Sequence, residues 1–180
     1  ELIAMKNTTV KNSTLKVQGK KDKNSVEDAL QIDVAAPKTA PVLAQYGRKF
    51  VNGQTCKNIK ILNNTIEGSR GVCANYAASD GKKYRNKFHE KIIIKGNKLT
   101  GYSAEGCTLY NTLSAVVKNN VITTHSTRKN ESYSVGLNIT IQGKTSGKKM
   151  NKSKITVANN TVYGYRQGIQ VVTRSSSRYK

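Results

Sequence analysis

The sequence has no tryptophan, two phenylalanines and two prolines, and only 10 acidic residues against 31 basic ones. No apolar run approaches the roughly 20 residues that a membrane-spanning helix needs, so a transmembrane helix is excluded. No leader of the kind that directs secretion is visible. The three cysteines, Cys56, Cys73 and Cys107, are too few for a disulfide scaffold, and no Cys/His cluster indicates a metal site. We therefore expect no disulfide framework, no metal and no cofactor.

The 180 residues suffice for one domain with a sizeable core, and the formal net charge is +21. Such a charge suggests an anionic partner: nucleic acid, acidic polysaccharide or an anionic cell envelope. The alternative is that lysine merely keeps an extended surface soluble. Arginine is scarce and no recognition-helix or aromatic-sheet motif is present, so we expect no specific nucleic-acid partner.

A repeated phrase organises the chain: apolar, any, apolar, two residues, Asn, any, apolar. The phrase occupies 59–68, 92–101, 115–122 and 155–164, with a degenerate first copy at 8–15. A further strand-like segment follows each copy, at 29–34, 71–72, 106–109, 136–141 and 168–171. Alternation with a period of two predicts strands. A single unit cannot bury its apolar side, but stacked units can, so the repeat predicts a solenoid.

Asparagine recurs at the bend of each unit. It tolerates left-handed backbone angles, and its amide bonds to nearby backbone. Stacked units would bring these side chains together as an internal hydrogen-bonded ladder, and we assign them a structural role: Asn64, Asn97, Asn120 and Asn160.

These units resemble the coils of the right-handed parallel β-helix, the pectate-lyase-like superfamily found in many bacterial secreted and surface proteins. The resemblance runs from about Thr8 to Thr173 and concerns architecture more than function. We expect an all-β, right-handed parallel β-helix of about five coils without substantial helix. Residues 1–180 would form a single domain, and neither end shows a polar cap, so we expect a fragment of a longer solenoid. Inserted loops are expected at 35–55, 75–90, 124–134 and 142–153.

One strand of each coil should present an outward column of polar side chains. In enzymes of the resembled superfamily the substrate groove commonly lies along this sheet, and amides and an aromatic ring suit sugar hydroxyls and rings. The alternative is an ordinary solvated strand face. The candidate binding residues, with three from adjacent turns, are Gln31, Asp33, Asn75, Thr108, Tyr110, Asn138, Thr140, Gln170, Arg70, Tyr165 and Arg166.

Catalytic residues are not apparent. Glycoside hydrolysis uses two nearby carboxylates, but the column offers Asp33 alone, with Glu105 in a turn two coils away. A lyase would want clustered carboxylates for calcium and a base, and the superfamily's lyase motifs are not found. We read His89 and His125 as solvated loop residues. Cys73 should point outward, as the thiol most open to modification, and Cys107 inward.

Together these features favour a non-catalytic recognition module of a bacterial extracellular or cell-surface protein, such as an adhesin. Its partner would be a host protein or glycoprotein, for example immunoglobulin or mucin, or an acidic polysaccharide, without membrane insertion. The alternatives are a polysaccharide lyase or epimerase acting on an acidic glycan, and a purely structural stalk.

Overall fold

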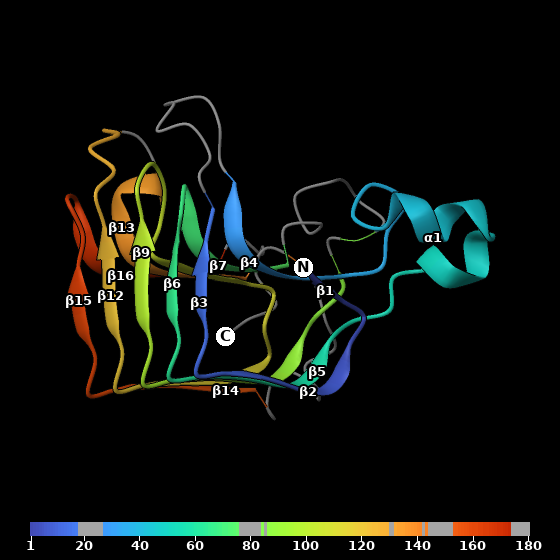
Figure 1. The fold of residues 1–180 in the computed structure, drawn as a ribbon, viewed down its shortest axis with the longest axis horizontal. Helices are drawn as coiled ribbons and strands as arrows, with labels where there is room; N and C mark the ends of the chain where they lie inside the picture. The colour runs from blue at the N-terminus through green and yellow to red at the C-terminus, as the bar shows by residue number, and fades with distance from the viewer. Residues whose placement is uncertain are drawn as a thin grey trace.

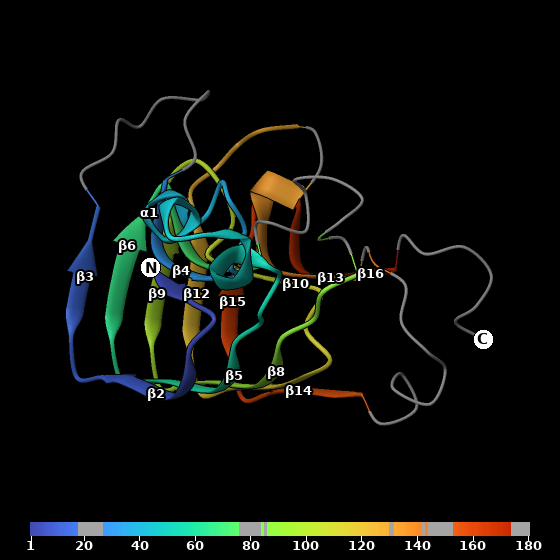
Figure 2. The same cartoon turned by 90° about the vertical axis from the view of Figure 1, so that its right-hand side faces the viewer.

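The computed structural model describes residues 1–17, 27–75, 84, 86–129, 132–141, 143 and 153–173. In these residues the chain winds as a parallel β-helix solenoid (Figures 1 and 2). Sheet A contains β1 (Leu2–Ile3), β4 (Asp28–Asp33), β7 (Arg70–Ala74), β10 (Cys107–Tyr110), β13 (Val135–Ile141) and β16 (Gln167–Thr173). Sheet B contains β2 (Lys6–Lys11), β5 (Lys57–Leu62), β8 (Glu90–Lys95), β11 (Ser114–Lys118) and β14 (Lys154–Ala158). Sheet C contains β3 (Thr14–Lys16), β6 (Thr65–Gly68), β9 (Lys98–Gly101), β12 (Val121–Thr124) and β15 (Thr161–Tyr163).

Each coil runs through one strand of sheet B, one of sheet C and one of sheet A, and five such coils follow one another. Every strand pairs in parallel with its counterpart in the next coil, at the spacing of about 4.8 Å that is usual for neighbouring strands. The predicted all-β solenoid of about five coils is therefore confirmed.

The core is a set of apolar columns, one residue from each coil. In sheet B, Ile59, Ile92 and Ala115 lie opposite one another, and so do Ile61, Ile94 and Val117. In sheet C the column is Ile66, Leu99 and Ile122. All of these side chains are buried in one cluster, because alternation along each strand sends every second residue inward.

The bend between sheets B and C uses two residues with separate tasks. The first takes a left-handed backbone conformation, with φ between 52° and 71°, at Asn12, Asn63, Gly96, Asn119 and Asn159. The next residue turns inward and forms the ladder. Asparagine and glycine adopt such angles with little strain, which explains why the repeat carries Asn-Asn or Gly-Asn at this point.

The ladder joins each coil to the next through asparagine side chains that form up to four hydrogen bonds each. Oδ1 of Asn97 accepts hydrogen bonds from N–H of Asn64 at 2.9 Å and from its Nδ2 at 3.0 Å. Nδ2 of Asn97 in turn donates to the carbonyl of Ile61 at 2.9 Å and to Oδ1 of Asn120 at 3.0 Å. The same pattern links Asn120 to Asn160. The buried polar groups of the bend are thereby satisfied, as a packed interior requires.

The expected loop at 35–55 contains two short helical segments, α1 (Pro41–Gln45) and η1 (Arg48–Val51), which project from the solenoid as a small lobe (Figure 1). A third segment, η3 (Ser132–Ser134), lies in the loop at 124–134. Most of the expected loops at 75–90 and 142–153 lie outside the described residues. In the described part of the chain, no helix is long and apolar enough to cross a membrane.

We expect Asn97→Ala to destabilise the protein by about 2–4 kcal/mol, because it leaves the buried N–H of Asn64 and carbonyl of Ile61 without partners. Urea denaturation measures the loss. Asn160→Ala is the matched control: Asn160 ends the ladder and is only half-buried, so its loss should be smaller. An equal loss of unfolding free energy in the two variants would contradict the claim that the buried part of the ladder stabilises the solenoid.

Candidate functional site

The register of sheet A matches the predicted column. Gln31, Cys73, Thr108, Asn138 and Gln170 lie opposite one another in successive coils. The second row places Tyr110 beside Thr140 and Thr140 beside Val172. Asp33 and Asn75 occupy the matching positions of the earlier coils, at the end of β4 and directly after β7.

Most of this column is not accessible to a ligand. Of the residues proposed for binding, the buried ones have exposed fractions of 0–3%: Asp33, Arg70, Asn75, Thr108, Asn138 and Thr140. Gln31, Tyr110 and Gln170 are half-buried, and Tyr165 and Arg166 are exposed. The expected solvated groove along sheet A is therefore wrong for its central residues. For the half-buried and exposed residues a binding role remains a prediction.

A buried ionic cluster explains part of this. The guanidinium of Arg70 lies 3.1 Å from a carboxylate oxygen of Asp28 and 2.9 Å from one of Glu105. Asn138 donates to the other oxygen of Glu105 at 3.3 Å, and the ring of Tyr133, from η3, lies against Arg70. Burial raises the pKa of Asp28, and the nearby positive charge of Arg70 opposes that rise. One guanidinium thus pairs with two carboxylates inside the protein, and we assign the cluster a structural role.

The expectation that Cys73 is the thiol most open to modification is also wrong. Cys73 points outward from the sheet, but it is fully buried beneath the cluster, with its sulfur 3.5 Å from Nη1 of Arg70. Burial raises the pKa of the Cys73 thiol well above its ordinary value, so the thiol is protonated and shielded rather than open to modification.

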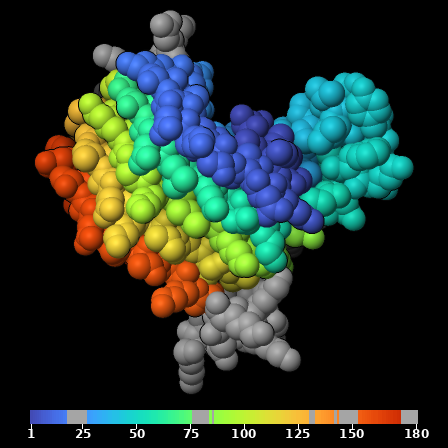
Figure 3. Space-filling model, turned by 60° about the horizontal axis from the view of Figure 1, so that its bottom comes forward, coloured from blue at the N-terminus to red at the C-terminus, as the bar shows by residue number. Residues whose placement is uncertain are grey.

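Sheet B presents the accessible charged surface. We call its outward side chains the basic face, and Figure 3 shows the successive coils crossing the molecule as bands from blue to orange. Its lysines are Lys11, Lys60, Lys91, Lys95, Lys118 and Lys154. These lysines lie in cross-strand rows of outward residues on β2, β5, β8, β11 and β14. The described positions of those rows include no Asp or Glu.

In-register stacking places these lysines close together. Lys95 and Lys118 are direct neighbours in adjacent strands, and Lys60 lies diagonally across from Lys95. Ile93 and Val116 are neighbours in the middle of the face, with Val116 exposed. The face therefore combines positive charge with a narrow apolar centre.

A shallow trough follows the strand starts of the basic face. Two adjoining hollows of about 260 and 340 Å³ share Asn58 and Lys91 in their walls. The first extends over Ser114 to Lys154, and the second over Asn7 to Lys6 and Lys57. We call this the lysine trough, and its walls come from all five strands of sheet B. The carboxylate of Glu90 lies beside it, 3.1 Å from Nζ of Lys57.

Lys91, at the centre of the trough, has a left-handed backbone conformation with φ of 56°. The corresponding residues of the two preceding coils are Asn7 and Asn58, with similar angles, and Nδ2 of Asn58 donates to Oδ1 of Asn7 at 2.8 Å. Lysine tolerates this conformation less well than asparagine. The N–H of Lys91 donates to Oγ of Ser114 at 2.9 Å, which ties the residue to the next coil.

Sequence reasoning missed the basic face as a site, although its signal was present. Lys60, Lys95 and Lys118 stand inside or at the edge of the repeated phrase, at positions that alternate with the buried residues.

Among the described residues, no group of three or more His, Cys, Asp or Glu side chains could hold a metal ion. No protein-family model, no curated protein and no solved structure significantly matches the chain.

His89 is fully buried, contrary to the expectation of a solvated loop residue, while His125 is exposed as expected. Nδ1 of His89 accepts the N–H of Cys56 at 2.9 Å, a bond that a protonated Nδ1 could not accept. Burial lowers the pKa of His89 to about 4, so the folded protein holds a neutral imidazole.

We therefore expect the free energy of unfolding to decrease as the pH is lowered from the ordinary histidine pKa near 6.5 to the pKa of about 4 in the folded protein. In this range the unfolded state binds a proton that the folded state does not. Between pH 7 and pH 5 the loss attributable to His89 should be about 2 kcal/mol. Urea denaturation of the wild type and of His89→Gln at both pH values isolates this contribution from that of the carboxylates. The same pH dependence in both proteins would show that the pKa of His89 does not differ between the folded and unfolded states, contrary to the expectation.

Proposed function

We propose that the protein is a non-catalytic recognition module that binds an acidic polysaccharide along the basic face of sheet B. The supporting observation is the lysine trough, which crosses five parallel strands and so runs along the solenoid axis. At about 4.8 Å per coil, five strands span roughly 20 Å. A linear polymer lying in the trough would meet cationic side chains in four of the five coils, from Lys6 to Lys154.

The chemistry of the walls favours a saccharide over other polyanions. Asn58, Ser114 and Thr156 offer amide and hydroxyl groups to sugar hydroxyls, while Ile93 and Val116 offer an apolar surface to sugar rings. Single-stranded nucleic acids are usually held by aromatic side chains that stack on the bases. The described outward residues of sheet B include no Tyr, Phe or Trp, so neither such stacking nor the aromatic anchors of protein interfaces are available there.

The resemblance of the repeat to the pectate-lyase-like superfamily also suggests where the protein would meet such a ligand. A β-helix of the pectate-lyase-like kind, on the surface of a bacterial cell or secreted from it, would meet acidic polysaccharides of its host or of its own envelope. Lysines on a rigid sheet are held near a fixed spacing, so a polyanion loses less freedom on binding than it would on mobile loops.

Lys91→Asn is the decisive variant. Removing one lysine from the trough should weaken binding to polygalacturonate or heparin about fivefold at low salt. Asparagine suits the left-handed backbone better, so stability should stay equal or rise by up to about 1 kcal/mol. Affinity is measured by isothermal titration calorimetry and stability by urea denaturation.

Lys98→Gln is the matched control, since Lys98 is exposed on sheet C and its loss removes the same charge from another face. Wild-type affinity should also fall steeply as salt rises. Equal weakening by both variants would contradict a localised site. Formation of unsaturated sugar products during incubation would contradict the non-catalytic assignment.

A further inference from the structure

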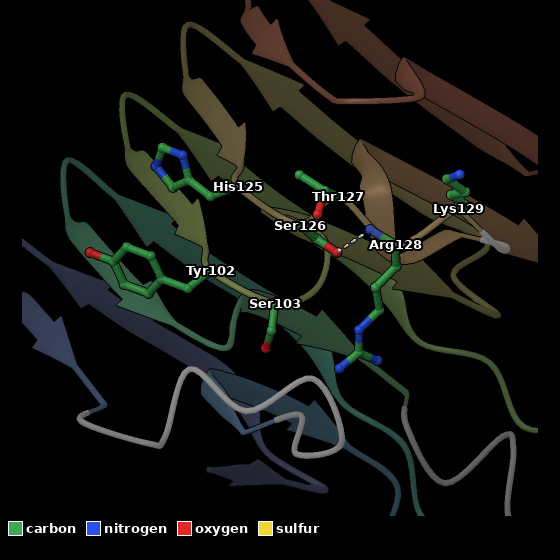
Figure 4. Close-up of a pocket in the computed structure, with 7 residues that line it drawn as sticks. All are labelled: Tyr102, Ser103, His125, Ser126, Thr127, Arg128 and Lys129. Carbon is green, nitrogen blue, oxygen red and sulfur yellow. Dashed lines mark hydrogen bonds between the residues drawn. The ribbon is translucent and has the colours of Figure 1, made fainter.

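Another hollow lies at the ends of sheet C, away from the basic face. Its volume is about 420 Å³, and it opens between the turn that carries Tyr102 and Ser103 and the segment 125–129 of the next coil (Figure 4). The first turn follows β9 and the second follows β12. None of the described residues that line the hollow is acidic, and two of them, Arg128 and Lys129, are cationic.

The hollow is held by the stacking of the coils. The N–H groups of Tyr102 and Ser103 donate to the carbonyls of Gly68 and Ser69 in the coil before, at 2.9 and 3.0 Å. The N–H of His125 donates to the carbonyl of Gly101 at 2.8 Å. The backbone of both turns is thus set by the solenoid.

Two aromatic rings form one side of the hollow. The rings of Tyr102 and His125 are stacked, with centroids 5.7 Å apart and planes 14° from parallel. The Tyr102 hydroxyl donates to Oε2 of Glu67 at 3.1 Å, and Glu67 pairs with Lys16 at 3.4 Å, so the tyrosine is oriented from outside the hollow. Figure 4 shows both rings on one side and the Arg128 guanidinium on the other.

Arg128 carries a buried hydrogen-bond donor that no described residue satisfies. Its guanidinium lies over the ring of Tyr133, 4.9 Å from the centroid, and the backbone N–H of Arg128 donates to Oγ of Ser126 at 3.4 Å. Nη2 of the guanidinium is buried and has no hydrogen-bond partner in the described part of the chain. A buried donor on a charged group is costly to leave unpaired, and guanidinium groups favour oxyanions.

We propose that this hollow binds a single sugar unit bearing an oxyanion, with the ring on Tyr102 and His125 and the oxyanion on Arg128 and Lys129. Carboxylate, sulfate and phosphate share this chemistry. The site is separate from the lysine trough and does not depend on polymer binding there. It would take the anionic end of a glycan or a free sugar acid or ester.

The test titrates the full 180-residue protein with glucose, glucuronic acid, glucose 6-sulfate and glucose 6-phosphate, each followed by NMR chemical-shift perturbation. We expect at least one anionic sugar to bind at least tenfold more tightly than glucose and to shift the resonances of Tyr102 and His125. The anionic sugar that binds best identifies the oxyanion. His125→Ala, at an exposed position, and Arg128→Gln should each weaken that binding at least fivefold.

Lys98→Gln is the matched control for Arg128→Gln, because it removes one positive charge from an exposed position that does not line the hollow and should leave affinity within twofold. Lys91→Asn separates the two sites: it should leave sugar binding here unchanged while weakening polysaccharide binding in the trough. Equal binding of glucose and all three anionic sugars, or wild-type affinity in both His125→Ala and Arg128→Gln, would overturn the proposal. Binding of inorganic sulfate as tight as that of glucose 6-sulfate would overturn the role of the rings.

Discussion

The buried hydrogen bonds between Asn64, Asn97, Asn120 and Asn160 hold successive coils at one register. A parallel strand pair can slip by two residues and still keep its apolar side inward, but such a slip would separate these amides and leave them unpaired in the core. The arrangement of the outward side chains of the sheets follows from this fixed register. A side chain one position beyond a core residue faces outward in every coil, so similar residues gather into columns.

Because similar residues gather into columns, the charge of the protein is concentrated on particular faces of the solenoid. The net charge of +21 would be diffuse on a folded domain without repeats. Here the alternate positions of sheet B bring lysine beside lysine, whereas sheet A buries its charges as Arg70 between Asp28 and Glu105. The same architecture therefore produces one outer face whose charged groups are paired and buried and another that stays open and positive. The open face is the one suited to a long anionic ligand.

The repeat was enough to predict the solenoid, the alignment of the sheet A column and the asparagine ladder, since each depends only on periodicity and residue type. Burial of that column could not be predicted, because it depends on segments that do not repeat. Tyr133, from the 124–134 insertion, lies against Arg70, and no spacing in the sequence places it there. His89 stands beside Glu90 at the start of β8, where the position next to a strand gave no sign that its ring would turn inward to meet Cys56.

Lysine acetylation footprinting with and without bound polygalacturonate tests the central claim most directly, because it compares every lysine in one experiment. Protection of Lys6, Lys57, Lys91 and Lys154, with Lys98 and Lys16 still reactive, is the result that polysaccharide binding in the lysine trough of sheet B predicts. Uniform protection of lysines on all faces, or protection confined to residues outside sheet B, would contradict it.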